Sequence, residues 1–300
     1  IDSLSGGDGA DRFVVGTAAH FTSLDSAEVV NGGAGDDTLA IAVGAASISV
    51  ASTDLLGLSS IKTIDVDNVD GQTASITLSD AVYTANGATS LSVTNSGTGT
   101  DDGITVTASA VTSGNTLAFT GASAAAANEN VTGGAGNDTF TFSTAGHATG
   151  YDANDTVNGG DGTDTLIIST GTAALTAATL TNVSNIEAIT VSGTTGGVGT
   201  LTLVDGNFAS VTGATVSATS LTTGALLFTA AAEDDSTFNI TGGAGADNIV
   251  GGQLADTISG GSGADTITGG LKADVLSGGA GADTFVFAAT TQSSGSNADT

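Results

Sequence analysis

Residues 242–286 consist of five consecutive nine-residue units, GGAGADNIV, GGQLADTIS, GGSGADTIT, GGLKADVLS and GGAGADTFV. Each unit has the form G-G-x-G-x-D-x-U-x, in which U is usually a large apolar residue. The glycines adopt the backbone angles of a tight turn at low cost, and the last three residues alternate as a short strand. Two units close one coil of about eighteen residues. The repeat therefore predicts parallel strands stacked coil upon coil.

The Asp at the sixth position of each unit points to metal chemistry. Asp247, Asp265 and Asp283 recur every eighteen residues, so they should stack on successive coils roughly 4.8 Å apart. At an effective dielectric constant near 20, two carboxylates at that distance repel by about 3.5 kcal/mol. A cation between them removes this repulsion. Carboxylates and turn carbonyls, with no Cys present, form an all-oxygen ligand set that favours Ca²⁺ over Mg²⁺.

This array resembles the calcium-binding RTX (repeats-in-toxin) nonapeptide repeats. The resemblance implies a parallel β-roll with several Ca²⁺ ions between the turns. It assigns the binding positions to the Asp residues above and to the first and fourth glycines of the intact units, which are Gly242, Gly245, Gly260, Gly263, Gly278 and Gly281.

Two units depart from the pattern, with Leu254 and Lys272 at the fourth position. Because alternate units share an edge, the intact turns should lie on one edge and the two altered turns on the other. We therefore expect one calcium row, built from Asp247, Asp265 and Asp283. The altered turns supply the weaker candidates Asp256 and Asp274, since Lys272 brings a positive charge to a cation site.

Four further units form two pairs, at 6–14 with 32–40 and at 133–141 with 159–167. The pairs are offset by 127 residues, which indicates internal duplication. The spacing of 26 within a pair equals one coil plus an eight-residue bulge. Paired turns should therefore stack. They give two further candidate calcium sites, ranked after the row of the tandem units: Asp11 with Asp37, and Asp138 with Asp164. A third copy begins after 278, so we expect the chain to be a segment of a longer protein.

Long stretches of alternating β pattern follow each pair, and helix signals are nearly absent. The stretch from Leu78 to Val131 spans 53 residues and its equivalent from Leu203 to Ile240 spans 37. The difference of sixteen is close to one coil, and a solenoid tolerates the loss of a coil. The alternative is an immunoglobulin-like β-sandwich inserted between the repeat blocks. The core should contain the apolar U residues, which include Phe13, Leu39, Phe140, Leu166, Ile258, Ile267 and Phe285.

The predicted fold class is all-β, a right-handed parallel β-solenoid or β-roll with RTX calcium turns. We divide the chain into three parts. Residues 1–132 hold the first pair of units and a β-solenoid stretch, 133–241 hold the second pair and a shorter stretch, and 242–300 hold the five tandem units and the start of a third module.

The charge of the chain narrows the choice of partners. There are 31 acidic and three Lys or Arg residues, for a formal net charge of −28. This charge argues against nucleic acid or an anionic membrane as a direct partner, and it fits a chain that repels itself until divalent cations bind. No apolar stretch is long enough for a transmembrane helix, and the absence of cysteine excludes disulfides.

We expect no enzyme activity in this segment. His20 and His147, the two histidines, occupy equivalent positions outside any metal-ligand cluster. No H-E-x-x-H or G-x-S-x-G motif occurs. Paired carboxylates can hydrolyse glycosides, but the regularly placed Asp residues are accounted for by the turn repeat.

The interspersed repeats, the Thr-, Ala-, Gly- and Ser-rich composition and the lack of cysteine resemble RTX-type bacterial surface-layer (S-layer) proteins. This resemblance implies a structural, extracellular protein of the Gram-negative cell surface that folds and self-assembles into a lattice on binding Ca²⁺. Cell-surface polysaccharide would be a partner through regions outside this segment. Two alternatives stay open: a filamentous spacer of a large RTX adhesin, and the secretion and folding domain of a type I secreted enzyme.

Overall fold

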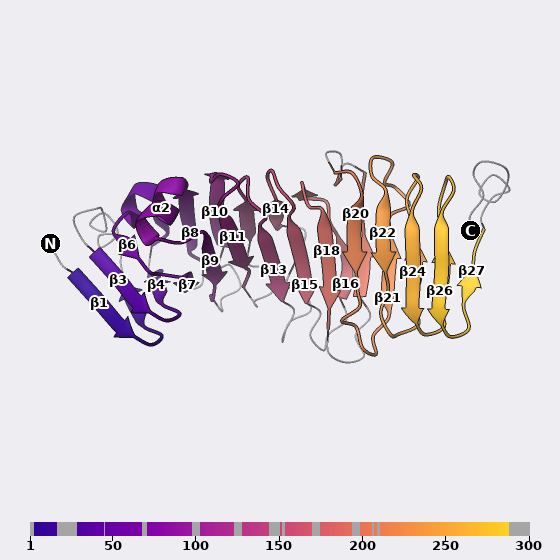
Figure 1. Ribbon diagram of the computed structural model, residues 1–300, viewed down its shortest axis with the longest axis horizontal. Coiled ribbons are helices and arrows are strands. Elements are labelled where there is room, and N and C mark those ends of the chain that lie inside the picture. The colour runs from indigo at the N-terminus through magenta and orange to yellow at the C-terminus, as the bar shows by residue number, and fades with distance from the viewer. Residues whose placement is uncertain are drawn as a thin grey trace. The chain divides into compact units, whose positions relative to one another are not determined.

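A computed structural model describes residues 3–16, 29–44, 46–67, 71–97, 103–122, 128–143, 151, 154–169, 175–193, 199–205, 207–208 and 211–287. These residues are all-β, with parallel strands stacked as a β-solenoid and very little helix (Figure 1). None of the described helices is both long and apolar enough to span a membrane. His20, His147 and the third copy beyond Phe287 lie outside the described residues.

The chain forms two compact units. Unit 1 contains residues 1–141 and 154–164, and unit 2 contains residues 142–153 and 165–300. The division of the sequence at 1–132, 133–241 and 242–300 describes the repeats and stays a prediction.

In unit 1 the strands belong to three sheets. The first contains β1 (Ser3–Asp8), β3 (Val29–Ala34) and β6 (Leu58–Ser59). The second contains β5 (Ile48–Val50), β8 (Thr73–Ser79), β10 (Gly103–Ala110), β12 (Glu129–Thr132) and β14 (Thr156–Asn158). The third runs β2 (Arg12–Val15), β4 (Thr38–Ala42), β7 (Thr63–Asp67), β9 (Ser90–Asn95), β11 (Thr116–Thr120) and β13 (Thr139–Ser143), of which residues 139–141 belong to unit 1.

Unit 2 alternates between two sheets. One runs β15 (Thr165–Ser169), β18 (Ala188–Ser192), β20 (Ala214–Ser217), β22 (Phe238–Thr241), β24 (Thr257–Ser262) and β26 (Val275–Ala280). The other runs β16 (Leu175–Thr179), β19 (Gly199–Thr202), β21 (Leu226–Thr229), β23 (Asn248–Val250), β25 (Thr266–Thr268) and β27 (Thr284–Phe285). The short strand β17 (Val183–Ser184) precedes β18. Figure 1 shows β20, β22, β24 and β26 side by side.

The strand register confirms the predicted coil. Asn239 of β22 pairs with Thr257 of β24, and Thr257 pairs with Val275 of β26, so each step along this sheet is eighteen residues. The other sheet of unit 2 advances by the same step from Asn248 to Thr266. The immunoglobulin-like alternative is wrong for the described strands, because their pairings are parallel, whereas such a sandwich is antiparallel.

The apolar U residues form the core, with two exceptions. Leu39, Phe140, Leu166, Ile258 and Ile267 are buried. On the neighbouring coils Leu39 is paired with Ile64, Phe140 with Phe119 and Leu166 with Ile189. Phe13 is only half-buried and Phe285 is 40% exposed, so their placement in the core was wrong. Both lie on strands, β2 and β27, that have a single described neighbour in their sheet, so one side of each ring lacks a covering coil.

The length difference between the two copies is half a coil, not the whole coil expected. In unit 1, Leu78 lies in β8 and Val131 lies in β12, and both strands belong to one sheet. In unit 2, Leu203 follows β19 but Ile240 lies in β22, in the opposite sheet. The stretch in unit 2 therefore has an odd number of strands fewer than the stretch in unit 1. The difference of sixteen residues corresponds to one strand together with its connecting turns.

Among the described residues of unit 1, two helices interrupt the strands, the 3-10 helix η1 (Ser52–Leu55) and α2 (Asp80–Asn86). The sequence patterns did not reveal α2. It ends at Gly87, whose left-handed φ of 70° lets its N–H bond back to the last turn. Asn86 accepts a hydrogen bond from the backbone N–H of Ile61 at 2.7 Å, and the Tyr83 hydroxyl donates to the carbonyl of Thr116 at 3.1 Å. These bonds attach the helix to the coils on either side.

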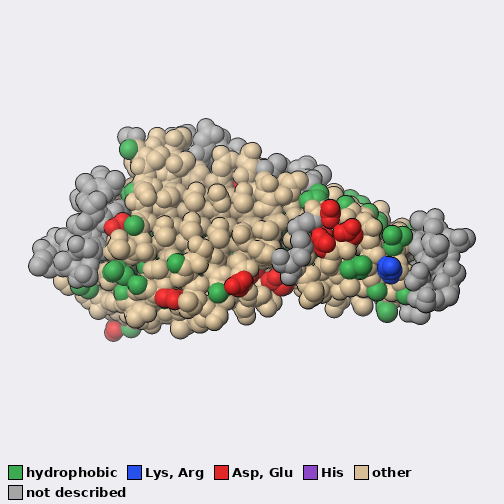
Figure 2. Space-filling model, turned by 90° about the horizontal axis from the view of Figure 1, so that it is seen from above, with side chains coloured by type: hydrophobic (Ala, Val, Ile, Leu, Met, Phe, Trp, Pro, Cys, Tyr) green, Lys and Arg blue, Asp and Glu red, His purple; other side chains and the backbone are tan. Residues whose placement is uncertain are grey.

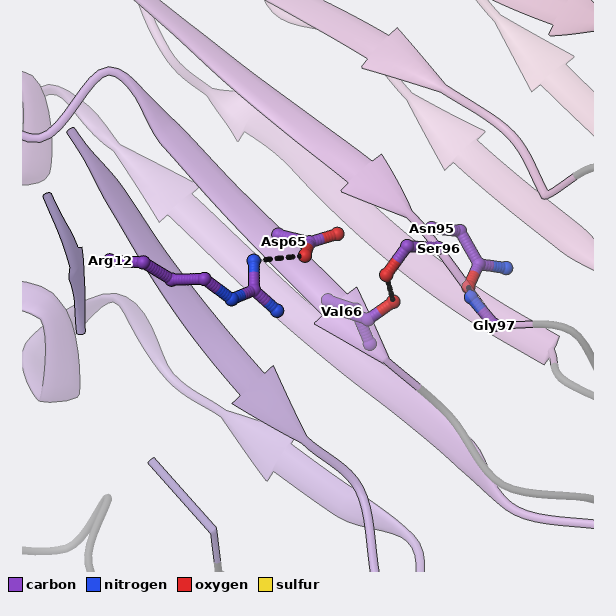
Figure 3. A network of polar contacts seen from close by, with 6 residues as sticks. All are labelled: Arg12, Asp65, Val66, Asn95, Ser96 and Gly97. Carbon is purple, nitrogen blue, oxygen red and sulfur yellow. Dashed lines mark hydrogen bonds and ion pairs between the residues drawn. The ribbon is translucent and has the colours of Figure 1, made fainter. Parts of the chain in front are cut away.

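One of the few basic side chains stabilises a buried carboxylate in unit 1. Arg12 of β2 reaches across β4 and forms an ion pair of 2.7 Å with Asp65 of β7 (Figure 3). Asp65 is 9% exposed, so its charge needs this partner inside the sheet. Next to it, the Ser96 hydroxyl donates to the carbonyl of Val66 at 3.3 Å.

Candidate metal centre

The repeat turns of unit 2 form two columns. We call the turns at 242–247, 260–265 and 278–283 the first column; they connect β22, β24 and β26 to β23, β25 and β27. We call the turns at 251–256 and 269–274 the second column; they connect β23 and β25 to β24 and β26. The intact and the altered units therefore lie on opposite edges, as predicted.

Carboxylates form a ladder along the first column. The Asp247 backbone N–H donates to Oδ1 of Asp265 at 2.8 Å, and the Asp265 N–H donates to Oδ1 of Asp283 at 3.0 Å. The ladder begins outside the repeat, where the Leu226 N–H donates to Oδ1 of Asp247 at 2.7 Å. Asp247 and Asp265 are buried, at 2% and 1% exposure. Each carboxylate thus accepts a hydrogen bond from the backbone of the preceding coil.

The second column has the same contacts. The Phe238 N–H donates to Oδ1 of Asp256 at 2.8 Å, and the Asp256 N–H donates to Oδ1 of Asp274 at 2.8 Å. Both Asp side chains are buried. Lys272 occupies the fourth position of its turn with a left-handed φ of 73°, and Gly263 and Gly281 at the same position of the first column also have positive φ. The structure therefore builds the column we ranked as weaker in the same way as the first.

The paired turns of unit 1 stack as predicted. The Asp11 N–H donates to Oδ1 of Asp37 at 2.9 Å, and the Asp138 N–H donates to Oδ1 of Asp164 at 2.7 Å. Parallel pairing continues through the first of these turns, with Gly7 opposite Gly33. Asp37, Asp138 and Asp164 are buried, and Asp11 is half-buried.

The turns occur in two conformations, which the sequence did not predict. In a closed turn, the second Oδ of the Asp accepts the N–H of the second glycine; this bond measures 2.6 Å in Asp138 and 2.7 Å in Asp247 and Asp256. In an open turn, the residues at the second and fourth positions have positive φ, as in Gly261 and Gly263. The open turns are those at 6–11, 32–37, 159–164, 260–265, 269–274 and 278–283. Each closed turn stacks on a layer without the repeat.

Open turns leave buried carboxylate oxygens without a hydrogen bond. Oδ2 of Asp11, Asp37 and Asp265 is buried and accepts no hydrogen bond among the described residues. An ionised oxygen in this position lacks the compensation that burial requires. Their second oxygens are therefore available as ligands.

Burial raises the pKa of several of these carboxyls. It raises the pKa of Asp256 to about 6, against the lowering effect of hydrogen bonds from Phe238 and Gly252. It also raises the pKa of Asp138, Asp247 and Asp265, and Asp283 adds repulsion at Asp265. The folded chain without a cation thus resists ionisation of these four carboxyls.

Backbone carbonyls complete the oxygen-rich surroundings. A Cβ added to Gly261 or Gly279 would overlap the carbonyl oxygen of the same glycine one coil earlier, Gly243 or Gly261. Gly263 and Gly281 meet the carbonyls of Gly245 and Gly263 in the same way. Adjacent turns therefore approach backbone to backbone, with carbonyl oxygens beside the carboxylates. Unsatisfied carboxylate oxygens and close carbonyls fit a hard cation such as Ca²⁺.

All Asp residues that the sequence singled out are therefore brought together in stacked turns, and their role as ion ligands stays a prediction. The sequence did not reveal two other acidic groups. Glu129 and Asp155 form a buried pair in unit 1. Asp205, Asp234 and Asp235 form an exposed cluster in unit 2. Neither group carries a repeat motif that would have indicated it.

Comparison with known families agrees with the turn geometry. The family described as RTX calcium-binding nonapeptide repeat (4 copies) matches residues 1–17, 24–40, 124–141, 147–167, 239–258 and 259–289. The matched segments include each of the stacked turns described above. No curated protein and no solved structure gives a match to this chain.

Proposed function

We propose, from the RTX calcium-binding nonapeptide repeats that this chain carries, that it is a structural module that folds outside the cell when Ca²⁺ binds and then assembles into a surface layer. RTX repeats bind Ca²⁺ in multiple turns and are typical of extracellular secreted proteins. The observation that carries the proposal is the ladder of buried Asp carboxylates on successive coils, in which Asp265 lies between Asp247 and Asp283.

The chain's own residues supply the ligands. Asp11 with Asp37, Asp138 with Asp164, and the Asp residues of both columns would hold Ca²⁺ between stacked turns, together with turn carbonyls. Bound Ca²⁺ supplies positive charge that offsets carboxylate repulsion, and it stabilises the folded state by an amount that grows with the logarithm of the free Ca²⁺ concentration above the dissociation constant. The glycines at the first and fourth positions let the two backbones approach closely enough to share an ion.

The charge of the whole chain supports a calcium-dependent switch. The net charge is −28, and on the face seen in Figure 2 red Asp and Glu side chains far outnumber blue ones. Extracellular calcium modules bind with dissociation constants of roughly 10⁻⁴–10⁻³ M, far above cytosolic calcium. The chain would stay unfolded during secretion and fold on meeting extracellular calcium.

Lattice assembly is the finer part of the proposal. Its support is the resemblance in composition and in the interspersed repeats to RTX-type surface-layer proteins of the Gram-negative cell surface. The same composition and arrangement of repeats favour a structural role without catalysis for this segment. A polysaccharide of the cell surface would bind through regions outside these residues.

The test is electron microscopy of the purified chain across a calcium titration, with circular dichroism on the same samples. Ordered sheets that appear together with the β signal support a surface-layer component. Folding into separate particles without sheets would refute the lattice and favour an adhesin spacer or the carrier domain of a secreted enzyme. Full β signal in the presence of a chelator would refute the calcium switch itself.

A further inference from the structure

The second turn of the first pair stacks on a layer that carries no repeat. The turn at 32–37 is followed along the solenoid by the layer at 58–62, where β3 pairs in parallel with β6. The backbone N–H of Lys62 donates to the carbonyl of Asp37 at 3.0 Å. The family match at 24–40 ends before this layer, so the repeat motif does not account for it.

One oxygen of Asp37 is left without a partner at this junction. Asp37 is 0% exposed, and its Oδ1 accepts the N–H of Asp11 from the preceding turn at 2.9 Å. Its Oδ2 is buried and accepts no hydrogen bond among the described residues. A Cβ added to Gly32 would overlap both this Oδ2 and the carbonyl oxygen of Ser60. Two acceptor oxygens therefore border one point, an arrangement that a cation stabilises and that neither oxygen stabilises alone.

The same arrangement occurs where two repeat turns follow each other. A Cβ added to Gly260 would overlap Oδ2 of Asp265 in its own turn and would lie 2.7 Å from the carbonyl oxygen of Gly278 in the next turn. Ser60 therefore supplies, from outside the motif, the carbonyl that the first glycine of the next repeat supplies elsewhere.

The backbone around Ser60 is held in an unusual conformation. Ser60 has a left-handed φ of 55°, and Asn185, its equivalent in the duplicated segments LSSIKTIDV and VSNIEAITV, has a φ of 52°. The helix α2 fixes this layer, because the carbonyl of Asn86 accepts the Ser60 N–H at 3.0 Å and its side chain accepts the Ile61 N–H at 2.7 Å. The structure therefore gives α2 a role that the strands do not supply, which is to position the Ser60 carbonyl.

A hollow beside the junction gives water access to these oxygens. It is lined by residues of the repeat turn, the layer at 58–62 and the end of α2, which include Gly33, Gly35, Ser60, Lys62 and Gly87. The ammonium group of Lys62 is paired with the carboxylate of Asp36 at 2.5 Å. Waters in this hollow can complete the coordination of a cation that the protein itself holds by few ligands.

We propose that Oδ2 of Asp37 and the carbonyl oxygen of Ser60 belong to a further Ca²⁺ site, which lies between the turn at 32–37 and the layer at 58–62. This site is separate from that of Asp11 with Asp37. It rests on the proposed calcium binding of the repeats and extends that binding by one layer beyond the motif. A carboxylate, a backbone carbonyl and water are the ligands that Ca²⁺ prefers.

The test uses terbium luminescence from an introduced tryptophan. The chain has no Trp, and Thr89→Trp places one at an exposed position next to Ala88, which lines the hollow. We expect Trp-sensitised Tb³⁺ emission that Ca²⁺ displaces. Adding Asp37→Asn should weaken terbium binding at the reporter roughly tenfold or more, because the charged ligand is lost. Adding Asp11→Asn removes a ligand of the ion between the paired turns only, so emission from the proposed site should persist.

Two substitutions of Ser60 test the carbonyl ligand. Ser60→Gly keeps the left-handed conformation at low cost and should keep the emission. Ser60→Val disfavours positive φ and displaces the carbonyl, so terbium binding should weaken roughly tenfold. Asp67→Asn, at an exposed position at the end of β7, is the control and should change nothing. Circular dichroism of each variant at saturating Ca²⁺ verifies the fold.

Equal loss of emission in the Asp11→Asn and Asp37→Asn chains would mean that a single ion between the paired turns accounts for the signal, and it would overturn the proposal. The absence of emission in the Thr89→Trp chain would do the same. In either case a β signal that still rises with Ca²⁺ shows that the repeats respond, whereas failure of the proposed function would abolish that response in every variant.

Discussion

At the scale of single residues, the sixth position of the repeat carries a charge that the fold alone does not stabilise. Oδ1 of Asp265 accepts the Asp247 N–H, while its buried Oδ2 accepts no hydrogen bond among the described residues. A carboxamide at this place keeps the acceptor and removes the charge. The hydrogen bond that holds the coil and the proposed binding of an ion can therefore be separated by substitution.

We predict opposite effects of Asp265→Asn with and without calcium. With Ca²⁺ at about one hundred times its dissociation constant, an ion stabilises the fold by about 2.7 kcal/mol, so the variant should lose about 2–3 kcal/mol of unfolding free energy. In chelator it should be at least as stable as the parent. Chemical denaturation under both conditions measures this, with Asp67→Asn as the matched control. An equal loss in both conditions would indicate an ordinary packing role.

Glu129 is a second buried acid, and it faces another acid. Burial, followed by the charge of Asp155 and a hydrogen bond between the two side chains, raises its pKa to about 9. Oε1 of Glu129 accepts the Ala122 N–H at 2.9 Å and the Asn95 amide at 3.2 Å. The folded chain therefore keeps Glu129 protonated at neutral pH, and the pair shares one negative charge.

This arrangement predicts a pH dependence. Because the folded pKa lies above the ordinary value of 4.5, the contribution of Glu129 to stability is fully present below about pH 4.5 and is lost as pH rises toward about 9. Glu129→Gln cannot ionise and can still donate to Asp155. The parent should therefore lose stability relative to the variant as pH rises over this range. Denaturation of both proteins at fixed calcium tests it, and a constant difference would contradict the assignment.

At the scale of elements, the turn conformation follows from position in a column rather than from the motif alone. The units at 251 and 269 both lack the fourth glycine, yet Lys272 is left-handed and Leu254 is not among the described residues with positive φ. The closed turn at 251–256 stacks on Glu233, and the open turn at 269–274 stacks on another repeat turn. Neighbouring layers therefore select between the two conformations.

Restoring glycine should have opposite effects at these two positions. Lys272→Gly relieves a left-handed conformation that costs a residue with a side chain roughly 1–2 kcal/mol, so the unfolding free energy should rise by about 1 kcal/mol. Leu254→Gly removes a side chain where the backbone needs no glycine, and the stability should fall by about 0.5–1 kcal/mol. Thermal or chemical denaturation of both variants at saturating calcium checks the signs. A gain in both would mean that glycine content alone matters.

At the scale of the whole molecule, charge repulsion adds to the conformational entropy that opposes the calcium-free fold. The chain has 31 acidic and three Lys or Arg residues, and the ion pairs among the described residues include Arg12 with Asp65 and Lys62 with Asp36. The Lys62 pair is exposed, and such pairs contribute little to stability. Divalent cations bound in the turns remove charge where it is most concentrated.

We therefore expect salt to replace part of the effect of calcium. In chelator, raising the ionic strength from about 0.01 M to about 1 M shortens the Debye length from about 30 Å to about 3 Å. The melting temperature should then rise by several degrees, and at saturating Ca²⁺ it should change much less. Circular dichroism melts with Mg²⁺ as the ion control test this. Equal salt dependence with and without calcium would place the repulsion outside the ion sites.

The sequence by itself determined the coil, the stacking of Asp247 on Asp265 and the pairing of Asp11 with Asp37, because these follow from a local period that repeats along the chain. Only the tertiary structure decided the features that depend on which layer lies next to which. These are the closed and open turns, the exposed ring of Phe285, the half-coil difference between the copies, the buried Glu129, and the cluster of Asp205 with Asp234. Their partners lie in different coils, and no periodic pattern records which side chains such layers bring together.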